Sequence, residues 1–191
     1  SLAYLAGIIL GYWHLSKMVK APGSPMAQRH ADDLFFYCTL GVILGGSLGG
    51  STIGVAPGAR WIAAKVFDDR GMSSLSALHL GFQWLLDPDG DAGTDDAPHV
   101  VNCSWAIQGS LNKCSLEFAD DLRALRAAGI AVVWAAGNNG PYSSTSYGPA
   151  NSPGSFAVGS AGKTAATPTL TSSRGPSACT NGFYPSILAP G

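Results

Sequence analysis

The sequence is poor in charge and contains no cluster of basic residues. Only 12% of its 191 residues are Asp, Glu, Lys or Arg, and the formal net charge is -1. Nucleic-acid binding needs a basic surface that neutralises phosphates, so this composition argues against a nucleic-acid partner. Hydrophobic residues make up 46% of the chain, which argues against disorder and predicts one folded domain with a sizeable core.

Long hydrophobic runs are also missing. The apolar stretch from Leu2 to Trp13 is shorter than the roughly 20 residues that span a bilayer, so we expect no transmembrane span. This stretch has no initiating Met, no basic leader and no small-residue cleavage site. No signal peptide is therefore visible.

The chain has no pair of cysteines at the Cys-x-x-Cys spacing of zinc or thioredoxin-like sites. Its four cysteines are spread out, at Cys38, Cys103, Cys114 and Cys179. Two interpretations stay open: buried free thiols, or a disulfide in an exported protein, for example between Cys114 and Cys179. The sequence does not determine the connectivity.

Apolar strands and amphipathic helices alternate after residue 60. The strands are expected at Trp61–Phe67, His99–Ser104, Ile130–Ala136 and Phe156–Ser160. One helix is expected at Ser73–Leu86 with Ser73 or Ser74 as its cap, and another at Leu116–Ala128 with Ser115 as its cap and Gly129 as its end. This order predicts an α/β fold with a parallel sheet covered by helices on both faces.

Ligands of such sheets bind beyond the carboxyl ends of the strands, which places Ser104-Trp105-Ala106 and Ala136-Gly137-Asn138 at the functional edge. The Asn138 amide is a neutral donor that can hold a developing oxyanion, an interaction worth about 2.7–4 kcal/mol in a transition state. A simple Asn-Gly turn is the alternative interpretation of the same residues.

An acidic turn follows the first expected helix and is a candidate calcium site. Asp87, Asp89 and Asp91 have the spacing of the first ligands of an EF-hand loop, but Ala92 and Pro98 stand where that loop has Gly and Glu. A solvated acidic turn is the alternative, and no motif requires a cofactor.

Seven short motifs resemble, in their order and spacing, the subtilisin-like serine peptidases (peptidase S8). The motifs are Gly54-Val55-Ala56-Pro57-Gly58-Ala59, Ala64-Lys65-Val66, Val101-Asn102-Cys103-Ser104-Trp105, Ala127-Ala128-Gly129-Ile130, Ala136-Gly137-Asn138, Ser172-Ser173-Arg174-Gly175-Pro176-Ser177 and Ala189-Pro190-Gly191. The resemblance implies a three-layer subtilisin-like fold with a mostly parallel central sheet, incomplete at both ends. Residues 1–40 would be a divergent segment, and residues 41–191 a partial peptidase domain.

The resemblance also implies roles for individual residues. Asn138 would complete the oxyanion hole, and the substrate polypeptide would be bound by Ser104, Trp105, Ala106, Ala135, Ala136 and Gly137. The peptide would pair with the first of these segments as an added strand. The family usually has Gly where this chain has Ala106, and the extra methyl group is expected to crowd the pocket.

The catalytic triad of the family does not transfer to this chain. The position of the catalytic histidine holds Phe35, whose ring cannot accept a proton. No Asp-Thr-Gly or Asp-Ser-Gly motif exists, and the family's serine would lie beyond Gly191. The resemblance therefore predicts part of a serine-type endopeptidase, a fragment or degenerate copy that is inactive alone.

Two alternatives follow from this missing triad. The chain is a non-catalytic pseudopeptidase that binds peptides or a partner, such as a complementing chain segment, or residues 1–38 replace the original start of the domain. The second idea rests on the sudden loss of resemblance at Cys38. The family resemblance and a disulfide both favour an extracellular protein.

Overall fold

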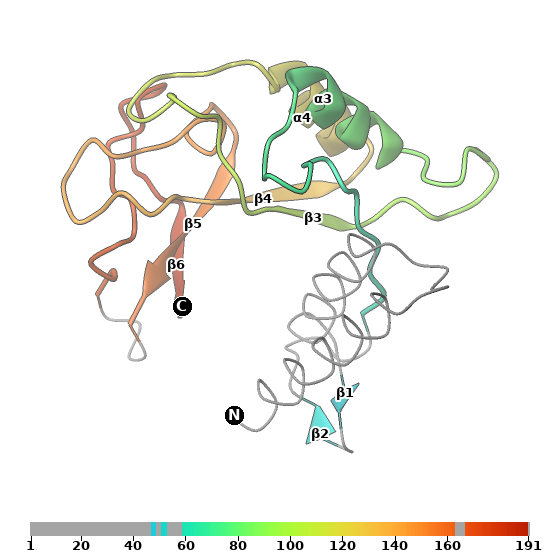
Figure 1. Ribbon diagram of the computed structural model, residues 1–191, viewed down its shortest axis with the longest axis horizontal. Helices are drawn as coiled ribbons and strands as arrows, with labels where there is room; N and C mark the ends of the chain where they lie inside the picture. Colours follow the sequence, from blue (N-terminus) through green and yellow to red (C-terminus); the bar gives the residue numbers. More distant parts are fainter. Residues whose placement is uncertain (1–46, 49–50, 53–58, 163–166, 191) are drawn as a thin grey trace, which may run out of the picture. The chain divides into compact units, whose positions relative to one another are not determined.

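The computed structural model describes residues 47–48, 51–52, 59–162 and 167–190 (Figure 1). The chain forms two compact units, Ser1–Ser73 and Ser74–Gly191, and each is described by itself. In the first unit, β1 (Ser47–Leu48) pairs with β2 (Ser51–Thr52) in antiparallel fashion. Cys38 and Phe35 lie outside the described residues.

The strand expected at Trp61–Phe67 is not formed. Its residues have an irregular backbone, although their apolar pattern suits a strand. A strand needs a neighbour that pairs with its N–H and C=O groups. None of the described segments pairs with Trp61–Phe67, so the pattern alone was not sufficient.

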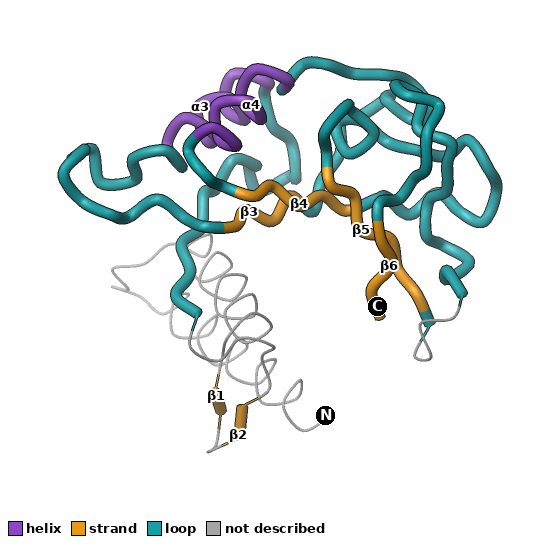
Figure 2. Tube along the Cα trace, turned by 180° about the vertical axis from the view of Figure 1, so that it is seen from behind, coloured by secondary structure: helices purple, strands orange, loops and turns teal. Residues whose placement is uncertain are grey.

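The second unit is built on a four-stranded parallel sheet. Its strands are β3 (Val100–Cys103), β4 (Ala131–Ala135), β5 (Phe156–Ala161) and β6 (Ile187–Pro190), in that spatial order. The first three confirm the expected strands. The fourth was not expected, because its short sequence has little pattern and depends on pairing with β5. Figure 2 shows the four strands side by side.

Two helices accompany these strands: α3 precedes β3, and α4 connects β3 to β4. Helix α3 (Leu75–Trp84) begins at the predicted cap, where the Ser74 hydroxyl accepts a hydrogen bond from the Ala77 amide at 3.1 Å. Helix α4 (Ala119–Ala127) begins later than expected, so Phe118 occupies the cap position and Ser115 does not cap the helix. Gly129 ends it as predicted, with a φ of 81°.

Both helices cover the same face of the sheet, over β3 and β4 (Figures 1 and 2). The core between them contains an aromatic cluster of Phe82, Trp105, Phe118 and Trp134. The rings of Trp105 and Trp134 are 4.9 Å apart and edge to face, a favourable arrangement for aromatic pairs. Trp134, the fourth of the five residues of β4, is completely buried.

The other face of the sheet carries exposed apolar side chains. Strand alternation places Val100, Phe156 and Ile187 on this face, and they are 60%, 44% and 47% exposed. No helix of the described residues lies over them. The described part of the α/β fold thus supplies the sheet and one of its helical layers.

A disulfide joins Cys114 to Cys179, which confirms the pairing given as an example from the sequence. Cys103 is a buried free thiol, and its burial raises its pKa to about 12. The disulfide interpretation therefore holds for Cys114 and Cys179, and the buried-thiol interpretation holds for Cys103. No described helix has both the length and the apolar character needed to cross a membrane.

Candidate functional site

Asn138 follows the end of β4 and lies at the rim of a hollow of about 240 Å³. The hollow is formed where the carboxyl ends of β4, β5 and β6 meet, which is the edge at which parallel sheets bind ligands. Its lining is small and uncharged: Ala135, Ala136, Gly137, Asn138, Val158, Gly159, Ser160, Ala189 and Pro190. None of these lining residues carries a charged side chain.

The turn that carries Asn138 needs glycine at position 137. Gly137 has a φ of 102°, a conformation that other residues rarely adopt. A Cβ atom at this position would also come within 2.9 Å of the Ser173 hydroxyl. Gly137 therefore lets the turn after β4 pack directly against the segment that contains Ser173.

The predicted substrate-binding residues fall into two groups. Ala135, Ala136 and Gly137 line the hollow together with Asn138, whereas the segment 104–106 does not line it. Ser104 and Ala106 are exposed just beyond β3. Trp105 instead turns its ring into the aromatic cluster beneath the helices. The substrate role of this second segment stays a prediction and rests on its backbone.

Histidines do not provide a general base at the hollow. Among the residues that the structure describes, none that lines it is a histidine, and its one hydroxyl side chain is Ser160. His99 precedes β3 and so lies at the opposite end of that strand. His79 is held by Asp121 Oδ2 at 2.8 Å and Glu117 Oε1 at 3.3 Å. The two carboxylates raise the pKa of His79, and the hydrogen bond to Glu117 makes the largest contribution.

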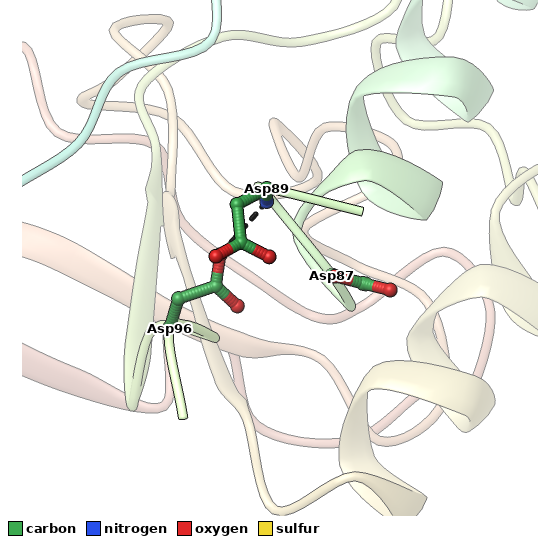
Figure 3. Close-up of side chains that lie close together, drawn as sticks. All are labelled: Asp87, Asp89 and Asp96. Atoms are coloured by element: carbon green, nitrogen blue, oxygen red, sulfur yellow. Dashed lines mark hydrogen bonds between the residues drawn. The ribbon is translucent and has the colours of Figure 1, made fainter. Parts of the chain in front are cut away.

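The acidic turn brings together a different set of carboxylates from the one expected. One oxygen from each of Asp87, Asp89 and Asp96 lies within 4.8 Å of the others (Figure 3), so Asp96 replaces Asp91 in the cluster. The Asp89 carboxylate accepts hydrogen bonds from the Thr94 hydroxyl at 2.9 and 3.0 Å. Asp96 Oδ2 accepts one from the Asp89 amide at 2.8 Å. These hydrogen bonds hold the turn together, and calcium binding stays a prediction.

Sequence reasoning missed the side chains that support the Asn138 turn. Ser173 lies within a quoted motif, but no role followed from the motif itself. Tyr184 was not singled out, although its hydroxyl donates a hydrogen bond to the Ala136 carbonyl at 2.6 Å. A partner 48 residues away along the chain leaves no local signal in the sequence.

Known proteins resemble most of this chain. The sequence model of the Subtilase family matches residues 39–191. Bacillopeptidase F from Bacillus subtilis (strain 168) is 40% identical over 120 residues, which cover 58% of this chain and 8% of that protein. The solved structure of the patellamide maturation protease PatA is 25% identical with a TM-score of 0.61, covering 80% of this chain and 51% of that one. The chain thus spans about half the length of that structure.

A shorter stretch resembles a protein of another kind. The phosphatidylglycerol–prolipoprotein diacylglyceryl transferase of Erythrobacter litoralis (strain HTCC2594) is 78% identical over 49 residues, which cover 26% of this chain and 17% of that protein. Only 38 residues precede the subtilase match. A stretch of 49 residues therefore overlaps that match by at least 11 residues wherever it lies.

Proposed function

We propose that this chain, which belongs to the subtilase family, supplies the oxyanion donor and the substrate-binding strand ends of a serine endopeptidase domain. Such enzymes hydrolyse peptide bonds through an acyl-enzyme, and a negatively charged oxygen develops in the transition state. The observation that carries the proposal is the position of Asn138 at the rim of the hollow between three strand ends. Its amide would stabilise that oxygen by about 2.7–4 kcal/mol.

We also propose that the chain does not cleave peptides by itself. Phe35 occupies the position of the family's histidine, and none of the described residues that line the hollow is a histidine. Nucleophilic catalysis by serine needs a base within hydrogen-bond reach. The second candidate function is peptide binding without cleavage, which the uncharged lining of the hollow favours.

The face of the sheet that the described helices leave exposed supports a role for a complementing segment. Val100, Phe156 and Ile187 expose apolar area that a folded domain normally buries, at about 25 cal/mol for each Å². We propose that a helical segment, from the same protein or from another chain, covers this face. The nucleophile and its base would belong to that segment.

Secretion is the localisation that the disulfide supports. Disulfides persist in oxidising compartments and are rare in the cytosol of most organisms. The pair Cys114–Cys179 is therefore expected in a protein that functions outside the cytoplasm.

The match to the transferase supports a foreign origin for the start of the chain. An identity of 78% over 49 residues greatly exceeds the 40% seen with Bacillopeptidase F. We propose that the transferase-like stretch lies at the start of the chain and runs on into the residues matched by the subtilase family, and that residues 1–38 replace the original start of the peptidase domain. Sequencing the source DNA across this region tests the idea. Failure to find a coding stretch for His-Gly-Thr-His in any frame nearby would refute it.

One experiment tests both the oxyanion role and the expected inactivity. The chain is incubated with a fluorophosphonate probe and with casein, and a short peptide with a free carboxylate is titrated into it. We expect neither labelling nor cleavage. We expect Asn138→Ala to weaken binding of the carboxylate about tenfold or more, since about 1.4 kcal/mol corresponds to a factor of ten.

Asn139→Ala is the matched control, because Asn139 is a neighbouring exposed asparagine whose side chain does not line the hollow. This variant is expected to bind the peptide like the unaltered chain. Cleavage that disappears in Asn138→Ala would overturn the proposed inactivity. Equal affinities for all three proteins would overturn the role of Asn138 as an oxyanion donor.

A further inference from the structure

The turn that carries Asn138 is held on both sides by one buried serine. Ser173 is completely buried, and its backbone amide donates a hydrogen bond to the Gly137 carbonyl at 2.9 Å. Its hydroxyl accepts a hydrogen bond from the Asn139 amide at 3.0 Å. Ser173 thus contacts the residue before Asn138 and the residue after it.

A buried tyrosine holds the preceding carbonyl. Tyr184 is 9% exposed, and its hydroxyl donates to the Ala136 carbonyl at 2.6 Å. The same hydroxyl accepts a weaker hydrogen bond from the Tyr147 amide at 3.4 Å. Burial raises the pKa of Tyr184 to about 12, so the hydroxyl keeps its proton and remains a donor at neutral pH.

Asn138 itself depends on this support. Asn138 is exposed, and its side-chain amide makes no hydrogen bond within the part of the chain that the structure describes. The backbone on either side therefore sets the direction of the Cα–Cβ bond of Asn138, and with it the region that the amide can reach. Groups that stabilise a transition state must be held to within about 0.5 Å of the productive geometry.

We propose that Ser173 and Tyr184 are positioning residues that fix the Asn138 turn and so aim its amide toward the oxyanion. This inference rests on the proposed oxyanion role of Asn138. The two side chains act through the backbone of Asn139 and Ala136 and do not touch the substrate. The close approach of Ser173 also accounts for the glycine at position 137, where a Cβ atom would meet its hydroxyl.

Two variants test the proposal by nuclear magnetic resonance on the ¹⁵N-labelled chain. Ser173→Ala removes the acceptor for the Asn139 amide. Tyr184→Phe keeps the ring but removes the hydroxyl, and with it the donor to Ala136 and the weaker acceptor for the Tyr147 amide. We expect hydrogen exchange at Asn139 to accelerate about fivefold or more in Ser173→Ala, as expected from the loss of one hydrogen bond. We expect the side-chain amide signals of Asn138 to shift in both variants.

Ser177→Ala is the matched control for a merely structural effect. Ser177 is 5% exposed, and its hydroxyl donates to the Asn151 carbonyl at 2.7 Å, away from the Asn138 turn. It is expected to lower the melting temperature without moving the Asn138 signals. Unmoved signals in both test variants, or equal shifts in the control, would overturn the proposal. If Ser173→Ala does not fold, Tyr184→Phe decides the question alone.

Peptide binding links this result to function. A peptide with a free carboxylate is expected to bind about fivefold more weakly to Tyr184→Phe, while the same peptide with a terminal amide is unaffected. Equal losses for both peptides would count against positioning of the oxyanion donor. If Asn138→Ala leaves binding unchanged, the oxyanion role fails, whereas the Asn138 signals still report on whether the turn is held.

Discussion

The disulfide between Cys114 and Cys179 gives the most quantitative prediction for stability. The two cysteines are 65 residues apart along the chain. Closing a loop of that length removes conformational entropy from the unfolded chain. In the chain-entropy model this stabilises the folded chain by about 4 kcal/mol at 25 °C. This is a large share of the roughly 5–15 kcal/mol by which most domains are stable.

The perturbation is the double variant Cys114→Ser with Cys179→Ser, compared with the oxidised chain by urea unfolding. A domain of this size has a denaturant slope of about 2 kcal/mol per M, so the midpoint should fall by about 2 M. Adding dithiothreitol should shift the oxidised chain to the same midpoint and leave the double variant unchanged. A shift below about 0.5 M in the double variant would refute the entropic reasoning.

Three further predictions concern other parts of the second unit. Because its carboxylate partners raise the pKa of His79, His79→Gln should destabilise the chain by roughly 1 kcal/mol at about pH 5 and by much less at about pH 9, measured by thermal unfolding. Leu125 is completely buried on α4, so Leu125→Ala should lower the free energy of unfolding by about 2–5 kcal/mol, measured by urea unfolding. Asp89→Asn should abolish any rise in melting temperature that millimolar calcium produces through the Asp87, Asp89 and Asp96 cluster.

The sign of the histidine effect follows from linkage. The pKa of His79 in the folded chain lies above its usual value of 6.5, so the stabilisation is fully present below pH 6.5 and is lost as the pH rises through the folded pKa. An equal gap between His79→Gln and the unaltered chain at both pH values would contradict it. A loss below about 1 kcal/mol for Leu125→Ala would contradict its core position. Calcium stabilisation that survives in Asp89→Asn would remove that cluster as the site.

The sequence predicted elements whose signals are local. Ser74 begins α3 and Gly129 follows the end of α4 as expected, because caps and stops depend on a few adjacent residues. The strand expected at Trp61–Phe67 does not form, because a strand also needs a neighbouring strand to pair with. Calcium binding by the acidic segment stays a prediction; the fold of the turn, rather than regular spacing, brings Asp96 beside Asp89.

The candidate site shows the same division. Asn138 was recognisable because its motif lies at the end of an apolar strand, where the fold class predicts a site. Ser173 and Tyr184, which hold the turn, were not recognisable, because they reach it from more than 30 residues away along the chain. Side chains that act at long range become visible only when the contacts are known.

The position of Asn138 does not depend on the face of the sheet that the described helices leave exposed. Its strand, β4, lies between β3 and β5 and presents Trp134 to the helix-covered face, where the ring is completely buried. The strand end is therefore fixed by pairing on both edges and by packing on one face, before any further segment is added. A complementing segment would bring the nucleophile to a turn that is already formed. The oxyanion half of the proposed site should consequently keep its geometry in this chain alone.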